Sequence, residues 1–229
     1  MDKKAFVLMS GGLDSSTSLY WAKDKFEQVE AITFDYFQRI NSEKNATRAI
    51  AKSAKVKLTE VKIPFIKEKS EYSKSKMSNG QSLQSYIPLR NLIFYSIAGY
   101  FAQVKDISNL VGGHNANDGE IFNDATKPYF RKMNELILQG LADSIDCKIL
   151  LPLIDMSRID IIRMANRLNV PIELTWSCHK EGKYPCRTCY ACKERLRAFS
   201  LLRLKDPAPY SMTRRKNGRI GVHIYPKRK

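Results

Sequence analysis

The sequence contains no apolar run that approaches the roughly 20 residues a helix needs to cross a bilayer. Its start, Met1-Asp2-Lys3-Lys4, leads directly into a short apolar segment and lacks the pattern of a cleavable signal peptide. No internal repeat is visible along its 229 residues. These absences argue against membrane-spanning, secreted and repeat proteins, so we expect a cytoplasmic globular protein that does not act at a membrane.

Acidic residues are scarce beside basic ones. The chain has 23 Asp and Glu against 39 Lys and Arg, which gives a formal net charge of +16. Such an excess raises the local concentration of anions, so ATP, pyrophosphate, nucleic acid and acidic membranes all fit it, and so does a merely solvated basic face. Part of the excess lies at the C-terminal end, in Arg214, Arg215, Lys216, Arg219, Lys227, Arg228 and Lys229. The charge therefore does not select a partner.

Short apolar runs alternate with segments of helical periodicity. The runs that we expect to be strands are residues 5–9, 30–34, 57–63, 110–111 and 149–153. The expected helices are residues 14–25, 42–54, 92–103, 129–141 and 157–168, the last with Ser157 as its N-cap. Two polar segments, 67–84 and 114–128, are expected to be loops. The alternation predicts an α/β fold with a doubly wound parallel sheet.

A glycine pair follows the first strand, in Ser10-Gly11-Gly12-Leu13-Asp14-Ser15-Ser16. Glycines let the backbone approach an anion, and the unpaired N–H groups and dipole of the next helix point at the same spot. Ser10, Ser15 and Ser16 add hydroxyl donors for phosphate. Asp14 repels phosphate directly, so we expect it to cap the helix or to hold a Mg²⁺ ion that bridges to phosphate.

The loop fits neither Gly-x-x-x-x-Gly-Lys nor Gly-x-Gly-x-x-Gly. It resembles the PP-loop of N-type ATP pyrophosphatases, Ser-Gly-Gly-x-Asp-Ser, at every fixed position. This resemblance implies cleavage of ATP between its α and β phosphates and transfer of AMP to an oxygen of the substrate. The activated oxygen then leaves when a nitrogen or sulfur nucleophile attacks.

Four of the five cysteines lie close together, at Cys178, Cys186, Cys189 and Cys192. Zn²⁺ prefers four tetrahedral ligands, and each Cys-x-x-Cys spacing suits two sulfurs on one ion. A structural zinc site is therefore favoured over free thiols, with an iron–sulfur cluster as the competing metal centre. The remaining cysteine, Cys147, is expected to be a small buried apolar residue.

Segments along nearly the whole chain resemble the 7-cyano-7-deazaguanine synthase (QueC) family. They are the loop region Leu8 to Ser18, Tyr86-Ile87-Pro88-Leu89-Arg90-Asn91, Gly112-Gly113-His114-Asn115-Ala116-Asn117-Asp118, Asp124, Thr175-Trp176-Ser177-Cys178 and Asp206-Pro207-Ala208-Pro209-Tyr210. The resemblance implies conversion of 7-carboxy-7-deazaguanine and ammonia to the nitrile, with ATP, Mg²⁺ and a structural Zn²⁺. The steps are carboxylate adenylation, amide formation and a second activation.

The resemblance also implies site residues. The nucleotide loop would comprise Leu8, Met9, Ser10, Gly11, Gly12, Leu13, Asp14, Ser15, Ser16, Thr17 and Ser18, and the residues expected to act in catalysis are Asp14, Ser15 and Arg90. Arg90 suits a carboxylate or phosphate and Asn91 an amide or base edge. Asp118 and Asp124 are expected at Mg²⁺ or at the guanine-like edge, or else as turn formers. His114 is a candidate proton carrier, or a solvated loop residue.

Three alternatives stay open. A related ligase on the same scaffold would pass the activated carboxylate to another amine, such as one on a protein. A tRNA-modifying PP-loop enzyme is disfavoured, because 229 residues leave no room for a separate RNA-binding domain. A binding module that has only kept the loop is the third.

The predicted organisation is a PP-loop α/β nucleotide-binding domain over residues 1–170, a four-cysteine zinc-binding region over 171–210 and a basic tail over 211–229. Apolar helices such as Leu92 to Tyr100 suit packing in a homodimer.

Overall fold

The computed structural model describes residues 4–37, 39–66, 87–142 and 146–209. Its sheet contains β1 (Lys4–Leu8), β2 (Gln28–Tyr36), β3 (Lys57–Ile63), β4 (Asn109–Val111) and β5 (Lys148–Leu150). The strands lie in the order β3-β2-β1-β4-β5 and every pair is parallel. Phe6 in β1 is opposite both Glu30 and Leu110. The predicted doubly wound parallel sheet is confirmed.

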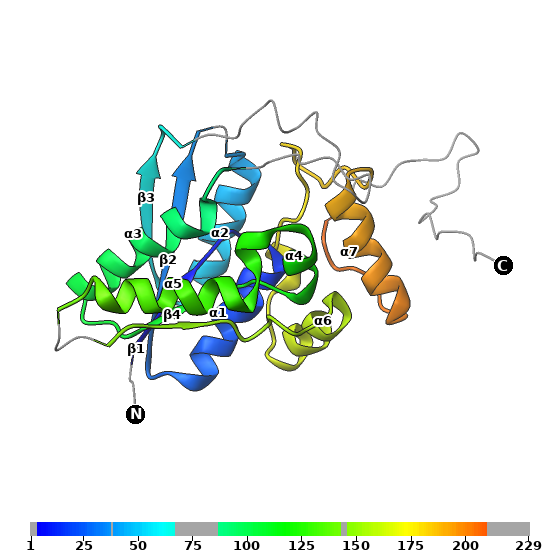
Figure 1. Cartoon of the computed structure of the whole chain (residues 1–229). Helices are drawn as coiled ribbons and strands as arrows, with labels where there is room; N and C mark the ends of the chain where they lie inside the picture. Colours follow the sequence, from blue (N-terminus) through cyan, green and yellow to red (C-terminus); the bar gives the residue numbers. More distant parts are fainter. Residues whose placement is uncertain (1–3, 38, 67–86, 143–145, 210–229) are drawn as a thin grey trace, which may run out of the picture.

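Helices cover both faces of this sheet (Figure 1). The larger ones are α1 (Leu13–Lys25), α2 (Asn41–Ala54), α3 (Arg90–Val104), α5 (Lys127–Gln139), α6 (Arg158–Arg167) and α7 (Tyr190–Leu201). Side chains of α1 and α2 share one core cluster with Ala5 and Val7 of β1. Side chains of α3 and α5 share another with Phe6. Because neighbouring strand residues point to opposite faces, the buried apolar residues 5–7 of β1 face the core on both sides of the sheet.

A third core cluster joins the C-terminal elements to the sheet domain. Leu13 at the start of α1 packs with Ile161 and Ile162 of α6 and with Phe199 of α7. Beside it, Arg195 and Asp206 form a buried ion pair, with Nε–Oδ2 and Nη2–Oδ1 distances of 2.8 and 2.9 Å. Arg195 also donates to Thr175 Oγ1 at 2.7 Å. The Asp-Pro-Ala-Pro motif noted in the sequence thus fixes α7 through its aspartate.

One sequence prediction about structure was wrong. Residues 114–128 are not a continuous polar loop, because they contain α4 (Ala116–Ile121) and a 3-10 turn, η2 (Asn123–Ala125), before α5 begins. Asn115 and Asp118 start α4 with a reciprocal capping box, in which each side chain accepts from the backbone of the other. Asn and Asp read as turn formers in the sequence, and here they serve as the cap of a short helix.

The other predicted elements are found within a few residues of their expected limits, including Ser157 as the N-cap of α6. Cys147 is 2% exposed and packs in the core, as expected. The predicted loop at 67–84 and the basic tail at 211–229 lie outside the described residues. In the described ranges, no helix combines the length and the apolar character needed to cross a membrane.

Candidate active site and metal centre

The PP-loop lies between β1 and α1, at the carboxyl end of the sheet where the strand order reverses. Gly11 has a φ of +87°, and a Cβ there would lie 2.7 Å from the carbonyl oxygen of Glu43 and 2.8 Å from Thr47 Oγ1. Only glycine is compatible with both the backbone angle and this contact with α2. Gly12 is the N-cap of α1 and has no side-chain cap. The N-terminus of α1 is therefore open towards an anion.

The serines of the loop divide into two groups. Ser10 Oγ and Ser15 Oγ lie 3.0 Å apart, and Ser10 Oγ also accepts from the Gly12 N–H at 3.3 Å. Ser16, Thr17 and Ser18 are buried and donate to backbone carbonyl oxygens, those of Gly12, Leu13 and Gly112 respectively. Ser10 and Ser15 therefore line the site, Ser16 and Thr17 bond within the first turns of α1, and Ser18 fixes α1 to the segment after β4.

A cavity of about 340 Å³ opens beside the loop. The loop side comprises Leu8, Met9, Ser10, Gly12, Leu13, Asp14 and Ser15, with Phe34 and Tyr36 from β2. Residues of α3 and of the segment 113–122 also line the cavity, among them Arg90, Asn91, Phe94, His114, Asp118 and Phe122. The PP-loop and Arg90, two parts of the predicted site that lie more than 70 residues apart in the sequence, thus line one pocket. Asp124 is not among the lining residues.

Two carboxylates approach each other on the pocket wall. Asp14 is the second residue of α1, and its Oδ2 accepts from Asn115 Nδ2 at 2.8 Å, so it does not cap the helix. Asp14 Oδ1 is buried and has no hydrogen-bond partner among the described residues. Burial and the neighbouring Asp14 charge raise the pKa of Asp118 to about 6. An orphaned carboxylate oxygen beside a second carboxylate fits a bound Mg²⁺ ion, since oxygen ligands are what this ion prefers.

The two residues at the start of α3 have different surroundings. Arg90 lies on the pocket wall, with its guanidinium carbon 5.8 Å from the centre of the Phe122 ring. Asn91 is 3% exposed, and its Nδ2 donates to the carbonyl oxygen of Asp124 at 2.8 Å. Its backbone N–H also donates to Asp124 Oδ2 at 3.4 Å. Asn91 and Asp124 therefore bind each other and hold η2 against α3, while Arg90 remains directed at the pocket.

Aromatic rings form the apolar part of the pocket. Phe34 and Phe94 are stacked with their centres 4.4 Å apart. His114 lies against the rings of Tyr95 and Phe130, at 5.9 and 4.7 Å between centres. Burial, with a contribution from the Arg90 charge, lowers the pKa of His114 to about 3. His114 is thus neutral at physiological pH and packs, half-buried, against these rings, and a role for it in proton transfer stays a prediction.

Sequence reasoning missed two arginines at the site. Arg39 is 7% exposed and donates to Ser10 O at 3.0 Å and to Thr33 Oγ1 at 2.8 Å, which fastens the loop to β2. Arg158, at the start of α6, lies 3.8 Å from Asp14 Oδ2 and also lines the pocket. Neither residue belongs to a recognisable motif, so their roles follow from the fold alone.

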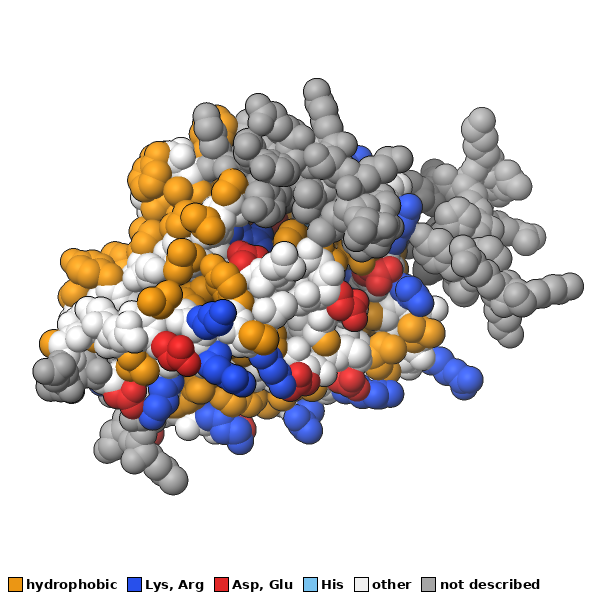
Figure 2. All heavy atoms as spheres, viewed as in Figure 1, with side chains coloured by type: hydrophobic (Ala, Val, Ile, Leu, Met, Phe, Trp, Pro, Cys, Tyr) orange, Lys and Arg blue, Asp and Glu red, His pale blue; other side chains and the backbone are white. Residues whose placement is uncertain are grey.

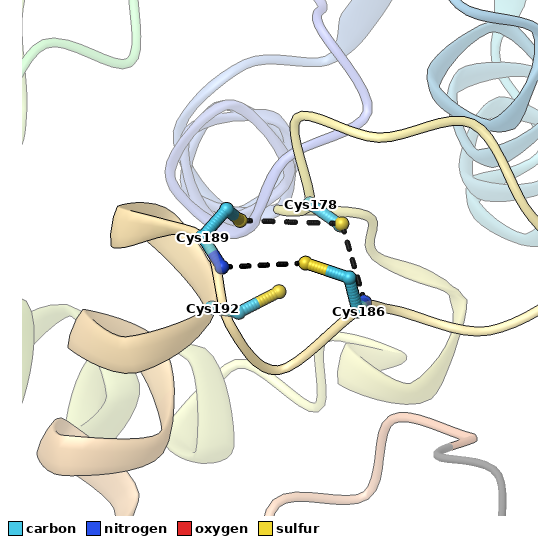
Figure 3. A group of neighbouring side chains, drawn as sticks. All are labelled: Cys178, Cys186, Cys189 and Cys192. Atoms are coloured by element: carbon cyan, nitrogen blue, oxygen red, sulfur yellow. Dashed lines mark hydrogen bonds between the residues drawn. The ribbon is translucent and has the colours of Figure 1, made fainter. Parts of the chain in front are cut away.

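The four clustered cysteines converge on one point (Figure 3). All four Sγ atoms lie within 4.8 Å of one another, and Cys178 and Cys189 Sγ are 4.0 Å apart. An ion about 2.3 Å from each of four tetrahedral sulfurs separates them by about 3.8 Å. Cys178 and Cys186 come from the preceding loop, whereas Cys189 is the N-cap of α7 and Cys192 lies in its first turn. The donor set fits a tetrahedral metal ion.

Burial and hydrogen bonds shift the pKa values of the clustered cysteines in different directions. Burial raises the pKa of Cys178 and of Cys192. Burial acts the same way on Cys186, but hydrogen bonds from Thr188 and from the Cys189 N–H outweigh it and lower the pKa of Cys186 to about 5. The cluster thus resists full ionisation on its own, and a bound cation would release its remaining protons.

The sheet, the strand-to-helix glycine loop and the pocket at its end define an α/β nucleotide-binding protein of the PP-loop class. The family described as "Queuosine biosynthesis protein QueC" matches residues 4–203. The chain belongs to this family and is an enzyme of the QueC type.

Two relatives carry the name 7-cyano-7-deazaguanine synthase. The protein from Thermoplasma volcanium is 36% identical over 226 residues, covering 92% of each chain. That from Campylobacter jejuni is 33% identical over 222 residues, covering 92% of this chain and 99% of its own. Among solved structures, a predicted tRNA methyltransferase subunit from Methanocaldococcus jannaschii matches with a TM-score of 0.49 and 16% identity, over 89% of this chain and 90% of that one.

Proposed function

We propose that this protein is an ATP-dependent carbon–nitrogen ligase that converts 7-carboxy-7-deazaguanine and ammonia to 7-cyano-7-deazaguanine. The observation that carries the proposal is one pocket that joins a complete PP-loop to Arg90 and Asp118. Membership of the QueC family and the names of relatives that match over 92% and 99% of their length support the substrate.

The loop side of the pocket suits ATP. The backbone N–H groups at the start of α1 and the hydroxyls of Ser10 and Ser15 would bind the phosphates. The stacked rings of Phe34 and Phe94 offer an apolar surface of the kind that receives a flat base. Asp14 and Asp118 would hold Mg²⁺, which when bound neutralises charge on the phosphate oxygens.

The part of the pocket around Arg90 suits a negatively charged substrate. The Arg90 guanidinium would bind the substrate carboxylate and keep it in line with the α-phosphorus. The carboxylate oxygen bonds to that phosphorus and pyrophosphate leaves. Ammonia then attacks the carbonyl carbon, AMP departs with the carboxylate oxygen, and the ammonia loses a proton to give the amide.

A second ATP activates the amide oxygen in the same way. Loss of AMP and of the two remaining nitrogen protons leaves the nitrile, so two ATP molecules are consumed and two AMP and two pyrophosphate are formed. Each AMP carries away one of the two original carboxylate oxygens. Asn91 and Asp124 would act by holding η2 beside the pocket rather than by direct contact.

We propose a structural Zn²⁺ on Cys178, Cys186, Cys189 and Cys192. With four sulfurs as ligands the ion would have no open position, so its contribution would be to hold the loop before α7.

A homodimer also stays a prediction. Apolar side chains gather around α3 (Figure 2), where Tyr100 and Val104 are 63% and 65% exposed, with Leu136 on α5 at 61%.

The test is to incubate the purified protein with ATP, Mg²⁺, ammonia and 7-carboxy-7-deazaguanine and to weigh every product, the protein included. We expect the free nitrile, with AMP and pyrophosphate in a two-to-one ratio to it. A covalently mass-shifted protein without nitrile would support the alternative ligase with a protein acceptor. Absence of pyrophosphate release would contradict both.

A further inference from the structure

Helix α2 receives its N-terminal cap from a distant part of the chain. Its own N-cap residue is Ile40, which makes no side-chain cap. Glu181 supplies the missing acceptors: its Oε2 accepts from the Asn41 N–H at 2.6 Å and from the Ser42 N–H at 3.4 Å. Its Oε1 accepts from Ser42 Oγ at 2.8 Å. A carboxylate at this end also complements the helix dipole.

Glu181 belongs to the cysteine loop, which we define as residues 178–189. It lies between the first two sulfur ligands, and Gly182 next to it exchanges hydrogen bonds with Ser42 Oγ at 2.9 and 3.2 Å. The segment after η3 (Ile172–Leu174) passes between α2 and α7 (yellow in Figure 1). The loop that would hold the metal is therefore fastened to the start of α2.

The first two turns of α2 in turn contact the PP-loop. The Glu43 carbonyl and Thr47 are the groups against which Gly11 is packed, at distances that no Cβ would tolerate. Thr47 Oγ1 accepts from Arg39, whose guanidinium also donates to Ser10 O, each at 3.0 Å. A shift of α2 along its axis would therefore move Ser10 and Gly11.

A second connection reaches Gly11 from the opposite side. The Trp176 N–H donates to Gly11 O at 2.9 Å. The Trp176 indole Nε1 donates to the Cys178 carbonyl oxygen at 2.7 Å, which ties this tryptophan to the first sulfur ligand. Gly11 is thus bound between α2 and the segment that leads into the cysteine loop.

We infer that Glu181 is a positioning residue for the ATP site, which acts through α2 on Gly11 when a metal ion holds the cysteine loop. The inference rests on the proposed function only in taking ATP as the ligand of the PP-loop. Because coupling between two sites is reciprocal, ATP binding strengthens metal retention by the same factor by which the metal strengthens ATP binding.

The test compares the wild-type chain, Glu181→Ala and the matched control Glu173→Ala, an exposed carboxylate on η3. Calorimetry gives the Kd for ATP in the presence of Mg²⁺, and a zinc-selective chromogenic chelator gives the rate of metal release with and without ATP. Glu181→Ala is expected to raise the Kd and the KM for ATP about fivefold, the scale of a lost helix cap, with less change in kcat. Glu181→Gln, which keeps one acceptor oxygen, is expected to recover part of the loss.

The rate of metal release distinguishes the inferred coupling between the two sites from an effect of Glu181 on stability alone. ATP is expected to slow chelation in the wild type and in Glu173→Ala, and to lose most of this protection in Glu181→Ala, although the metal content of all three is the same. An unchanged Kd and unchanged protection, with only a lower melting temperature, would overturn the inference. Nitrile formation by the wild type alongside that result would leave the proposed function intact. ATP binding and protection without nitrile would refute the function and support the inference.

Discussion

The PP-loop and the cysteine loop are the two most recognisable segments of the sequence, and they obtain their shape by different means. The PP-loop is completed by the chain itself, through the Gly11 contact with α2, the Arg39 hydrogen bond to Ser10 and the Ser18 hydrogen bond to Gly112. At the cluster formed by the cysteine loop and Cys192, burial raises the pKa of Cys178 and Cys192, so the four sulfurs face one another without full ionisation. The first loop is formed by the fold, and we expect the second to need a cation to hold its sulfurs as thiolates.

The largest expected effect is on the PP-loop. Asp14→Asn keeps the shape of the side chain but removes the charge on the orphaned oxygen that fits Mg²⁺. We expect pyrophosphate release to fall on the order of 100-fold or more, with an unchanged melting temperature. Asp24→Asn, which changes an exposed residue of the same helix, is the control and should retain full activity. Near-normal turnover by Asp14→Asn would contradict a role of Asp14 in Mg²⁺ binding.

The second prediction concerns the cysteine loop. Cys189→Ser removes one of four sulfur ligands and should lower metal content and stability together. A ligand present at about 1,000 times its Kd contributes about 4 kcal/mol, or roughly 10 °C in melting temperature for a chain of this length. Cys147→Ser, in the core, should lower the melting temperature while metal content stays at one per chain. Full stability in a metal-free wild-type preparation would show that the chain forms this loop unaided.

A third change tests the part of the C-terminal region that is held without metal. Arg195→Met leaves the Asp206 carboxylate buried without its partner, and we expect a loss of about 3 kcal/mol in the free energy of unfolding. Arg197→Met, on the same helix with a side chain 71% exposed, should change it by less than about 0.5 kcal/mol. Denaturant unfolding measures both. Equal effects of the two substitutions would show that the buried pair has no special part in fixing α7.

The smallest expected effect is a dependence of stability on pH. The folded-state pKa of Asp118 is raised to about 6, so its charged form is disfavoured by folding and it costs stability as the pH rises from about 4 to 6. Asp118→Asn should therefore be more stable than the wild type at pH 7, by about 1 kcal/mol after solvent screening, and the gain should vanish near pH 4. The same variant should lose Mg²⁺-dependent activity.

Asp160→Asn is the control, because its expected effect on stability at pH 7 is opposite in sign to that of Asp118→Asn. The Ser157 hydroxyl holds the pKa of Asp160 below its usual range, so this carboxylate adds stability at pH 7 that is lost as the pH falls through its folded-state value. Its replacement should make the protein less stable at pH 7. A gain from both substitutions, or from neither, would contradict the assignment of Asp118 as a carboxylate whose charged form is disfavoured by burial and by the Asp14 charge.

The features that could be predicted from the sequence are those that depend on residues close together in the chain. The apolar run of residues 5–9 predicted a buried strand, and the glycine pair after it predicted the loop, because each depends only on neighbouring residues. Arg39 and Arg158 could not be found this way, since their partners, Ser10 and Asp14, are distant in the sequence and meet them only in the fold. The helix α4 was missed because Asn115 and Asp118 are residue types that favour turns and helix caps alike, and here they form a capping box.

The most direct test of the central claim, that this pocket adenylates a carboxylate, follows the carboxylate oxygens. We would supply 7-carboxy-7-deazaguanine labelled with ¹⁸O at both carboxylate positions and weigh the AMP, pyrophosphate and deazapurine products. The account predicts one ¹⁸O atom in every AMP formed and none in pyrophosphate. AMP without label, or label in a phosphate product, would contradict it, because the activated group would then not be an AMP ester of the substrate.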